Sequence, residues 1–223
     1  MKTFRLFSYS LLLAVLVLSL ASCSTDTDEQ DARRIALVTV YPQSTGEFLL
    51  QLDDSTTLEP VNVKSSPFGD KIVRALVSYC DADDAAATMR KVNIYRMDSI
   101  RTKLPVATTA TDDDTAFGND PIEIVRDWVT VAEDGFLTLR VRTVWGNGKQ
   151  HVLNLVSGVN KDNIYELTLR HDAKGDTVGH MGDAMIAFNL NKLWNNPGED
   201  VKVKLNWKSF SGDKSIEFSM KMH

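Results

Sequence analysis

Histidine and aspartate side chains of the kinds that bind metals or transfer protons gather in one part of the sequence. His171 and Asp172 are followed by Asp176 and His180, while His151 lies further upstream. His151 opens and His171 closes neighbouring predicted strands, so the two could approach each other. Structural zinc sites, however, use tightly paired ligands, and catalytic sites usually show a helix-borne pair. We therefore predict no metal and no cofactor, and interpret these side chains as solvated or hydrogen-bonded loop residues.

Other patterns that accompany catalysis are weak. Ser157-Gly158 has no evident histidine partner, and no Gly-x-Ser-x-Gly elbow or glycine-rich phosphate loop is present. Cys80 ends the apolar run Ile72–Tyr79, which indicates a small buried hydrophobe rather than a reactive thiol. Asp112-Asp113-Asp114 could bind calcium but lacks the alternating spacing and distal glutamate of a calcium loop. We predict no catalytic residues.

The four tryptophans are the remaining candidates for a binding site. Trp128, Trp145 and Trp207 lie inside predicted strands at or near core-facing positions, so we expect them to pack in the core. Trp194 lies in a polar stretch beside Asn195, where an exposed ring could stack on a sugar or anchor a protein partner. A cap over one end of the fold is the favoured alternative for Trp194. Trp194 and Asn195 are the predicted binding residues.

The N-terminus predicts export. Lys2 and Arg5 precede the apolar run Leu11–Leu20, the layout of a secretory signal peptide. Leu20-Ala21-Ser22-Cys23 resembles a bacterial lipobox, in which Cys23 is lipidated and becomes the new N-terminus. An ordinary cleaved signal with a chance cysteine and an uncleaved anchor helix are the alternatives, although the run is shorter than the ~20 apolar residues of a membrane span. The predicted partner of Cys23 is the membrane, through a lipid anchor.

Charge and composition restrict the exported part. Removing residues 1–22 takes away two positive charges and moves the formal net charge from −5 to −7. No basic stripe is present to neutralise phosphates, so we predict no nucleic-acid partner. Residues 23–34 are polar and acidic and predict a solvated tether, although an acidic run at this place could also direct the protein to the cell surface. The predicted location is the cell envelope, in the outer membrane, in its periplasmic or surface-exposed leaflet.

Short runs of β-branched and aromatic residues predict an all-β chain with two domains. Residues 35–105 contain five predicted strands, and closure into a small OB-like barrel would remove their edges. Lys64–Lys71 leaves little room for the helix usual in that fold, because it contains Pro67 and Gly69. The predicted strands are Ile35–Tyr41, Glu47–Leu52, Leu58–Val63, Ile72–Cys80 and Lys91–Ile100.

The second predicted domain spans residues 121–223, after a linker at 106–120 that is rich in threonine and aspartate. Its runs alternate apolar and polar residues, as antiparallel strands with one solvated face do, and glycine-containing turns separate them. This pattern favours a β-sandwich. The predicted strands are Ile122–Val131, Phe136–Trp145, Gln150–Val156, Tyr165–His171, Ala184–Leu190, Val201–Phe210 and Ser215–Met222.

Three segments of the second half resemble a known family. Asp120–Val131 (DPIEIVRDWVTV), Gly135–Gly146 (GFLTLRVRTVWG) and Tyr165–Asp176 (YELTLRHDAKGD), together with the lipobox, are similar to the NigD-like lipoproteins. The resemblance implies an N-terminal OB-like domain and a C-terminal β-sandwich. It also implies a cell-envelope protein for which an immunity role against bacteriocins was proposed.

These observations predict a binding protein without catalysis. Recognition of a protein partner, as in bacteriocin or toxin immunity, is the leading hypothesis. A carbohydrate-binding accessory lipoprotein with a glycan ligand is the alternative, and a hydrolase comes third. An exposed aromatic platform would favour a sugar, whereas a broad apolar patch with a polar rim would favour a protein.

Overall fold

The computed structural model describes residues 33–82, 89–146, 148–194 and 197–223, and Arg34–His223 form one compact unit. The predicted signal peptide, Cys23 and Asn195 lie outside the described residues. Within the described part of the chain, no helix is both long and apolar enough to span a membrane.

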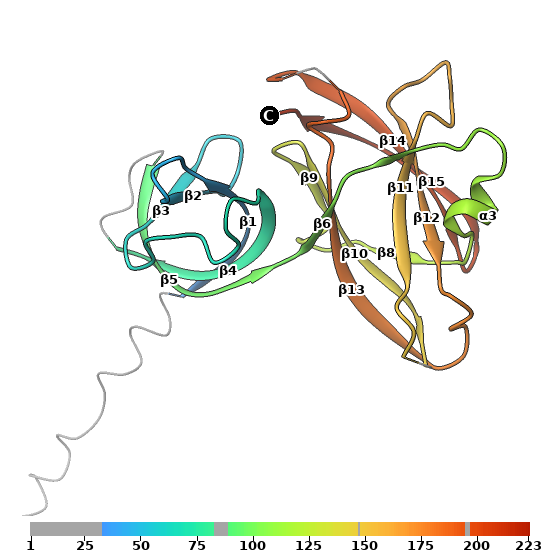
Figure 1. Ribbon diagram of the computed structural model, residues 1–223, viewed down its shortest axis with the longest axis horizontal. Coiled ribbons are helices and arrows are strands. Elements are labelled where there is room, and N and C mark those ends of the chain that lie inside the picture. Colours follow the sequence, from blue (N-terminus) through green and yellow to red (C-terminus); the bar gives the residue numbers. More distant parts are fainter. Residues whose placement is uncertain (1–32, 83–88, 147, 195–196) are drawn as a thin grey trace, which may run out of the picture. The chain divides into compact units, whose positions relative to one another are not determined.

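The first five strands close into a barrel in the order β1-β2-β3-β5-β4 (Figure 1). Neighbouring strands are antiparallel except for β3 and β5, which are parallel. Residues 61–72 between β3 and β4 form turns and no helix, as Pro67 and Gly69 predict. The predicted small barrel is confirmed. Its strands are β1 (Arg34–Pro42), β2 (Phe48–Gln51), β3 (Thr57–Pro60), β4 (Val73–Asp81) and β5 (Met89–Ser99).

The remaining strands form two five-stranded sheets. One has the order β6-β13-β10-β8, with β9 also paired to β10, and the other has the order β15-β14-β12-β11-β7. The first five elements of this part are β6 (Arg101–Lys103), β7 (Val106–Ala107), the helix α3 (Asp113–Phe117), β8 (Glu123–Val125) and β9 (Val131–Glu133). The longer strands are β10 (Phe136–Trp145), β11 (Val152–Ser157), β12 (Glu166–Asp172), β13 (His180–Asn189), β14 (Asp200–Ser209) and β15 (Gly212–Lys221).

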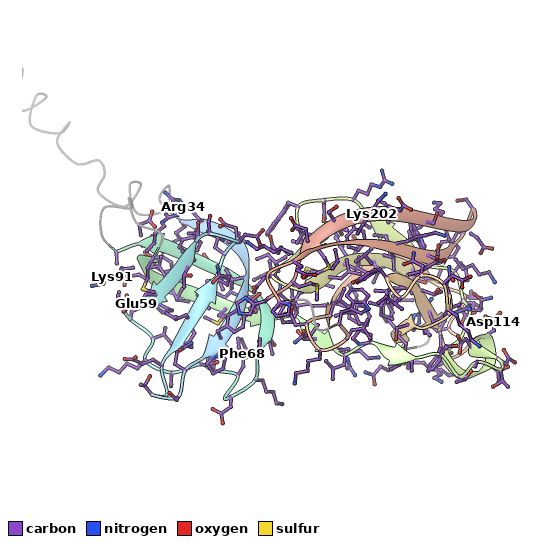
Figure 2. All side chains as sticks on the ribbon, turned by 90° about the horizontal axis from the view of Figure 1, so that it is seen from above. Arg34, Glu59, Phe68, Lys91, Asp114 and Lys202 are labelled. Atoms are coloured by element: carbon purple, nitrogen blue, oxygen red, sulfur yellow. The ribbon has the colours of Figure 1, made fainter. Side chains whose placement is uncertain are left out.

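The core of the sandwich follows the alternation that the sequence predicts. Leu137, Leu139 and Val141 of β10 are buried, while Arg140 and Arg142 point outward. Side chains of this kind from both sheets fill the space between them (Figure 2). At roughly 25 cal/mol per Å² of apolar surface removed from water, this burial is the main stabilising term of the fold. The predicted fold class, an OB-like barrel followed by an antiparallel β-sandwich, is confirmed.

The structure differs from the expected linker at 106–120. β6 pairs in parallel with β13 of one sheet, and β7 pairs in parallel with β11 of the other. The segment between them and β8 contains α3, whose first turn is capped by the Asp112 side chain. Edge strands of two or three residues are too short to show an alternation of apolar and polar residues. The sequence therefore indicated only a linker rich in threonine and aspartate.

The predicted strand Ile122–Val131 is two short strands, β8 and β9, with a turn between them. The Asp127 carboxylate accepts a hydrogen bond from the Val129 N–H, and the Thr130 hydroxyl donates one to the Val125 carbonyl oxygen. This turn exposes 59% of Trp128, which was expected in the core. That prediction is wrong because local turn bonds interrupt the alternation on which it rested.

The outer face of the barrel is buried where it meets the sandwich. Leu37 of β1 and Ile100 contact Ala187 of β13 in a small apolar cluster, with Leu76 and Val131 beside it. The inward side chains of Ile35–Tyr41 fill the barrel, and the outward Leu37 is covered by the second domain, whereas the outward Ile35 is 68% exposed.

Arg74 of β4 is fully buried at this joint. Its Nη1 donates to Thr39 Oγ1 at 2.8 Å, and its Nε donates to Thr138 Oγ1 of β10 at 3.3 Å. Its Nη2 pairs with the Glu133 carboxylate at the end of β9. A guanidinium placed in the interior is tolerated only when its charge and donors are matched. Arg74 therefore ties the barrel to the sandwich.

A second polar contact crosses the same joint. The Tyr41 hydroxyl donates to Asp134 Oδ2 at 2.9 Å, and Asp134 Oδ1 lies 2.9 Å from Nδ1 of His223. The rings of Tyr41 and His223 stack with their centroids 4.9 Å apart. Burial and the Asp134 carboxylate raise the pKa of Tyr41. The β9–β10 turn thus holds both the partner of Arg74 and the partner of Tyr41.

Replacing Arg74 by methionine should therefore lower the free energy of unfolding by about 3 kcal/mol, because Glu133, Thr39 and Thr138 lose their shared partner. Urea unfolding followed by tryptophan fluorescence measures this change. Arg96→Met is the matched control, since Arg96 pairs with Asp98 on the exposed surface and should change stability by less than about 1 kcal/mol. Equal effects of the two substitutions would show that the joint does not depend on Arg74.

Candidate functional site

The most exposed aromatic surface of the sandwich is centred on Trp128. The ring lies at a hollow of about 320 Å³ whose apolar wall contains Leu76 of β4, Val129 and Met185 of β13. The polar wall contains Asp127, Arg140 and Asp183. We call this set of residues the Trp128 surface. Because Leu76 comes from the barrel and the others from the sandwich, both domains shape it.

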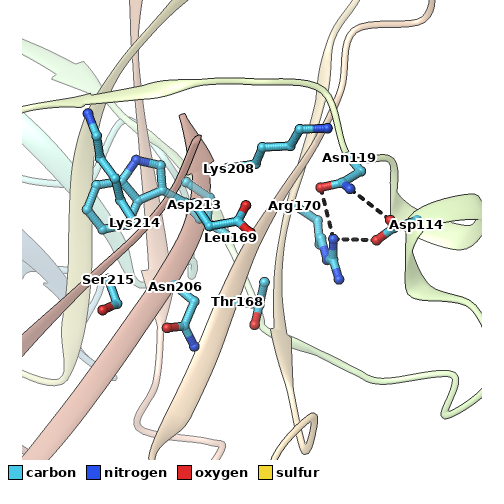
Figure 3. Close-up of a pocket in the computed structure, with 11 residues that line it drawn as sticks. Asp114, Asn119, Thr168, Leu169, Arg170, Asn206, Lys208, Asp213, Lys214 and Ser215 are labelled. Carbon is cyan, nitrogen blue, oxygen red and sulfur yellow. Dashed lines mark hydrogen bonds and ion pairs between the residues drawn. The ribbon is translucent and has the colours of Figure 1, made fainter. Parts of the chain in front are cut away.

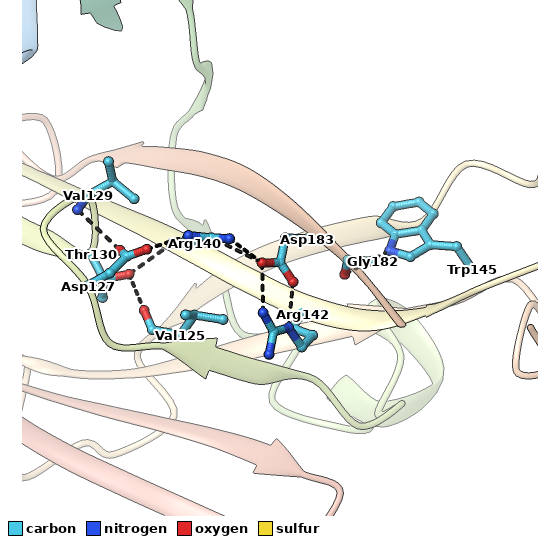
Figure 4. A network of polar contacts seen from close by, with 9 residues as sticks. All are labelled: Val125, Asp127, Val129, Thr130, Arg140, Arg142, Trp145, Gly182 and Asp183. Carbon is cyan, nitrogen blue, oxygen red and sulfur yellow. Dashed lines mark hydrogen bonds and ion pairs between the residues drawn. The ribbon is translucent and has the colours of Figure 1, made fainter. Parts of the chain in front are cut away.

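A network of ion pairs joins Asp127, Arg140, Arg142 and Asp183 (Figure 4), and Asp127 directly precedes Trp128 in the sequence. Arg140 Nη1 donates to Asp127 Oδ2 at 2.7 Å, and Arg140 Nε donates to Asp183 Oδ2 at 2.9 Å. Arg142 also donates to both oxygens of Asp183. Hydrogen bonds from Arg142 and Arg140 lower the pKa of Asp183 to about 2. The network therefore keeps its charges at neutral pH and fixes the polar edge of the Trp128 surface.

A polar groove of about 520 Å³ lies on the outer face of the other sheet (Figure 3). Arg170 of β12 donates to Asp114 of α3 and, at 3.1 Å, to Asn119 Oδ1. Lys208, Asp213 and other polar side chains complete its walls. Trp207 also borders this groove, but it is 92% buried, so the groove offers hydrogen bonds without an exposed ring.

The histidines singled out in the sequence form a buried chain of contacts. His151 Nδ1 lies 2.9 Å from His171 Nε2, and His151 Nε2 lies 3.5 Å from Asp176 Oδ2. Trp145 stacks on the His151 ring with the two centroids 4.1 Å apart. The expected approach of His151 and His171 is thus observed. The prediction that they are solvated loop residues is wrong, because both side chains are buried. Asp176 is 99% buried because its turn folds back, so that its Oδ2 accepts a hydrogen bond from the Gly146 N–H at 3.0 Å.

The hydrogen bonds of this chain indicate where its protons are. His171 Nδ1 lies 3.2 Å from the Pro121 carbonyl oxygen, which can only accept, so His171 Nε2 is left to accept from His151 Nδ1–H. Burial, followed by the neighbouring His151, lowers the pKa of His171. Both ring nitrogens of His171 have partners, whereas the buried Nε2 of His151 has no hydrogen-bond partner and lies 3.5 Å from Asp176 Oδ2. All three side chains are buried, so the cluster is part of the interior of the sandwich.

The remaining candidate residues fall in different places. Trp194 is 91% buried and meets the Tyr165 ring edge-on at 4.9 Å, so it fills the core and offers no face to a ligand. Cys80 is only partly buried, with Sγ 3.2 Å from the Tyr95 hydroxyl. Within the described residues, no group of three histidine, cysteine, aspartate or glutamate side chains is placed to hold a metal ion.

Family comparison covers almost all of the described chain. The NigD-like N-terminal OB domain matches residues 37–100, and the NigD-like C-terminal β-sandwich domain matches residues 105–220. No curated protein matches the sequence.

Solved structures with the same fold include three informative ones. A toxin-related protein from Parabacteroides distasonis is 27% identical with a TM-score of 0.72, covering 85% of this chain and 93% of that chain. A NigD-like immunity protein from Bacteroides caccae is 24% identical with a TM-score of 0.56, covering 83% and 91%. A lipoprotein from Bacteroides fragilis is 13% identical with a TM-score of 0.57, covering 85% and 97%. The last two likenesses concern the fold alone.

The histidine chain predicts a specific pH dependence. A histidine whose pKa is lowered on folding favours the neutral form, so its contribution to stability is complete above the unfolded value of about 6.5 and is lost as the pH falls towards its folded-state value. We expect the unfolding free energy of the wild type to decrease between about pH 7 and pH 5. His171→Gln should cost about 1–3 kcal/mol at neutral pH and flatten this decrease.

Equilibrium urea unfolding at a series of pH values tests this expectation. His180→Gln is the matched control because His180 is exposed on β13, and it should keep the wild-type slope. An identical slope in the wild type and in His171→Gln would contradict the assignment of the pH dependence to His171.

Proposed function

Since the chain belongs to the NigD-like family, we propose that it is a non-catalytic, lipid-anchored protein of the cell envelope that binds a protein partner through the Trp128 surface. The partner that fits best is a bacteriocin or another antibacterial protein toxin, against which the protein would confer immunity. The exposure of Trp128 is the observation that carries this proposal.

The composition of the Trp128 surface supports a protein partner. Tryptophan and arginine are the side chains most enriched among the residues that dominate binding energy at protein interfaces. Trp128 is 59% exposed beside Arg140, and Met185 and Leu76 add apolar area next to it. Methionine adapts its shape to a partner, and the ion pairs around Asp183 form a polar rim.

The immunity role draws support from related structures. The Bacteroides caccae protein with the same fold is described as a NigD-like immunity protein, and the Parabacteroides distasonis protein as toxin-related. An immunity protein acts by binding. The burial of the histidine cluster and the exposure of Trp128 both agree with such a role.

A glycan ligand is the second candidate, and the exposed Trp128 ring is the feature that favours it. Sugar binding combines ring stacking with several free hydrogen-bonding groups. Here the groups beside Trp128 are paired with one another, while the open polar groove around Arg170 lies on the other sheet and has no exposed ring. This separation favours the protein partner.

The anchor proposal rests on the sequence Leu20-Ala21-Ser22-Cys23. A cysteine that carries two or more acyl chains holds a protein stably on a membrane. The lipoprotein of Bacteroides fragilis that shares the fold agrees with this location. We propose the outer membrane as the site of attachment.

Trp128→Ala should abolish protection if the Trp128 surface binds a toxin, because truncating a central tryptophan at an interface typically costs 2 kcal/mol or more, at least a tenfold loss of affinity. Survival of a sensitive strain that expresses the wild type or the variant, challenged with a panel of bacteriocins and contact-delivered protein toxins, measures the effect. Phe210→Ala is the matched control, since Phe210 is 47% exposed at the β14–β15 turn.

Three results would separate the hypotheses. Equal protection by wild type and Trp128→Ala would exclude the Trp128 surface as the binding site. Binding of a glycan array by the wild type, lost in Trp128→Ala, would favour the carbohydrate function instead. Cys23→Ala should move the protein from the membrane fraction to the soluble fraction, and its retention in the membrane would contradict the lipid anchor.

A further inference from the structure

A second hollow opens between the two sheets of the sandwich, and it shares Ala184 and Met185 with the Trp128 surface. It has a volume of about 290 Å³ and lies where β6 faces β11. Lys103 of β6 spans the gap, since its Nζ donates to the Leu153 carbonyl and, at 2.7 Å, to Asn154 Oδ1. We call it the inter-sheet cavity. Its size is close to the lower end of small-molecule sites.

Two cations line the inter-sheet cavity, and no carboxylate does. Arg101 and Lys103 both come from β6, and the other lining residues are apolar, aromatic or neutral amide side chains, together with His151. In the described part of the chain, no ion pair or hydrogen bond reaches the Arg101 guanidinium. Burial and the neighbouring Arg101 charge lower the pKa of Lys103. Two like charges held together without a counter-charge attract an anion.

The rest of the cavity wall is apolar and held in place. Trp145 is fixed on one side by its stack on His151 and on another by donation of its Nε1–H to the Gly182 carbonyl at 3.2 Å. Val141 and Ile186 come from adjacent strands of the same sheet. A wall whose side chains are already ordered costs a ligand little to organise.

We propose that the inter-sheet cavity binds a small organic anion, with its carboxylate between Arg101 and Lys103 and its apolar body against Trp145. An inorganic anion would leave the apolar wall unused, and a cation would be repelled by the two charges. The arrangement of a few converging polar groups on a mostly apolar wall is typical of small-molecule sites. This inference does not rest on the function proposed for the Trp128 surface.

Hexanoate is a suitable probe, with 1-hexanol and inorganic phosphate as comparisons that lack its charge and its chain. Calorimetric titration of the full chain carrying Cys23→Ala should show hexanoate binding at least tenfold tighter than either comparison. Arg101→Met and Lys103→Met should each weaken hexanoate about tenfold, because a hydrogen bond to a charged group is worth about 1.5–3 kcal/mol. Both substitutions keep most of the apolar side chain.

Lys161→Met is the matched control, because Lys161 is exposed in the β11–β12 loop outside the cavity, and it should bind hexanoate as the wild type does. If Lys103→Met fails to fold, the exposed Arg101→Met still tests the site, together with a shift of the Trp145 indole signal in NMR spectra on addition of hexanoate. Absence of hexanoate binding, equal binding of 1-hexanol or phosphate, or unchanged binding by Arg101→Met would overturn the proposal.

Discussion

The burial of one guanidinium sets the arrangement of this protein. Arg74 is fully removed from water between the barrel and the sandwich, and it is matched by Glu133 and by the hydroxyls of Thr39 and Thr138. An unpaired charge at this place would cost several kcal/mol, so the two domains must meet in the register that supplies these partners. Leu76 lies two residues further along β4 and on the same outer face. The pairing of Arg74 thereby places Leu76 at the Trp128 surface.

The barrel and the sandwich contribute differently to the surface of the protein. Several outward side chains of the barrel strands β1 and β4, among them Leu37, Leu76 and Tyr41, contact the sandwich. The sandwich has an exposed tryptophan on one sheet and a polar groove on the other. Its buried histidine chain is occupied with hydrogen bonds. The exposed tryptophan is the feature on which the proposed binding function rests.

Much of the fold could be predicted from the sequence because its strands alternate cleanly. The alternation of Leu137, Leu139 and Val141 with Arg140 and Arg142 placed β10 correctly, and the glycine-containing turns separated the long strands. β6 and β7 were missed because strands of two or three residues are too short to show an alternation of apolar and polar side chains. The proposed binding surface was missed for a related reason: Trp128 continues an apparent alternation that hydrogen bonds of the Asp127 and Thr130 side chains interrupt.

The histidine cluster shows a different limit of sequence reasoning. The proximity of His151 and His171 could be expected from neighbouring strands, since they lie near the paired ends of β11 and β12. The burial of Asp176 could not be expected, because an aspartate in a turn is normally solvated. Only the packing of its loop against the rest of the fold, where Asp176 accepts a hydrogen bond from the Gly146 N–H, removes it from water. Local patterns report on strands and turns, whereas long-range contacts decide which loop residues become interior.

We propose that the barrel and the sandwich fold as one cooperative unit, joined through Arg74 and Tyr41, and together form the Trp128 surface. Hydrogen exchange by pulse labelling at increasing urea concentration, read by mass spectrometry, follows both domains in a single sample. We expect peptides from β4 and from β10 to lose protection at the same urea concentration. Loss of protection in β4 at a clearly lower concentration than in β10 would contradict it, because the barrel would then unfold while the sandwich remains intact.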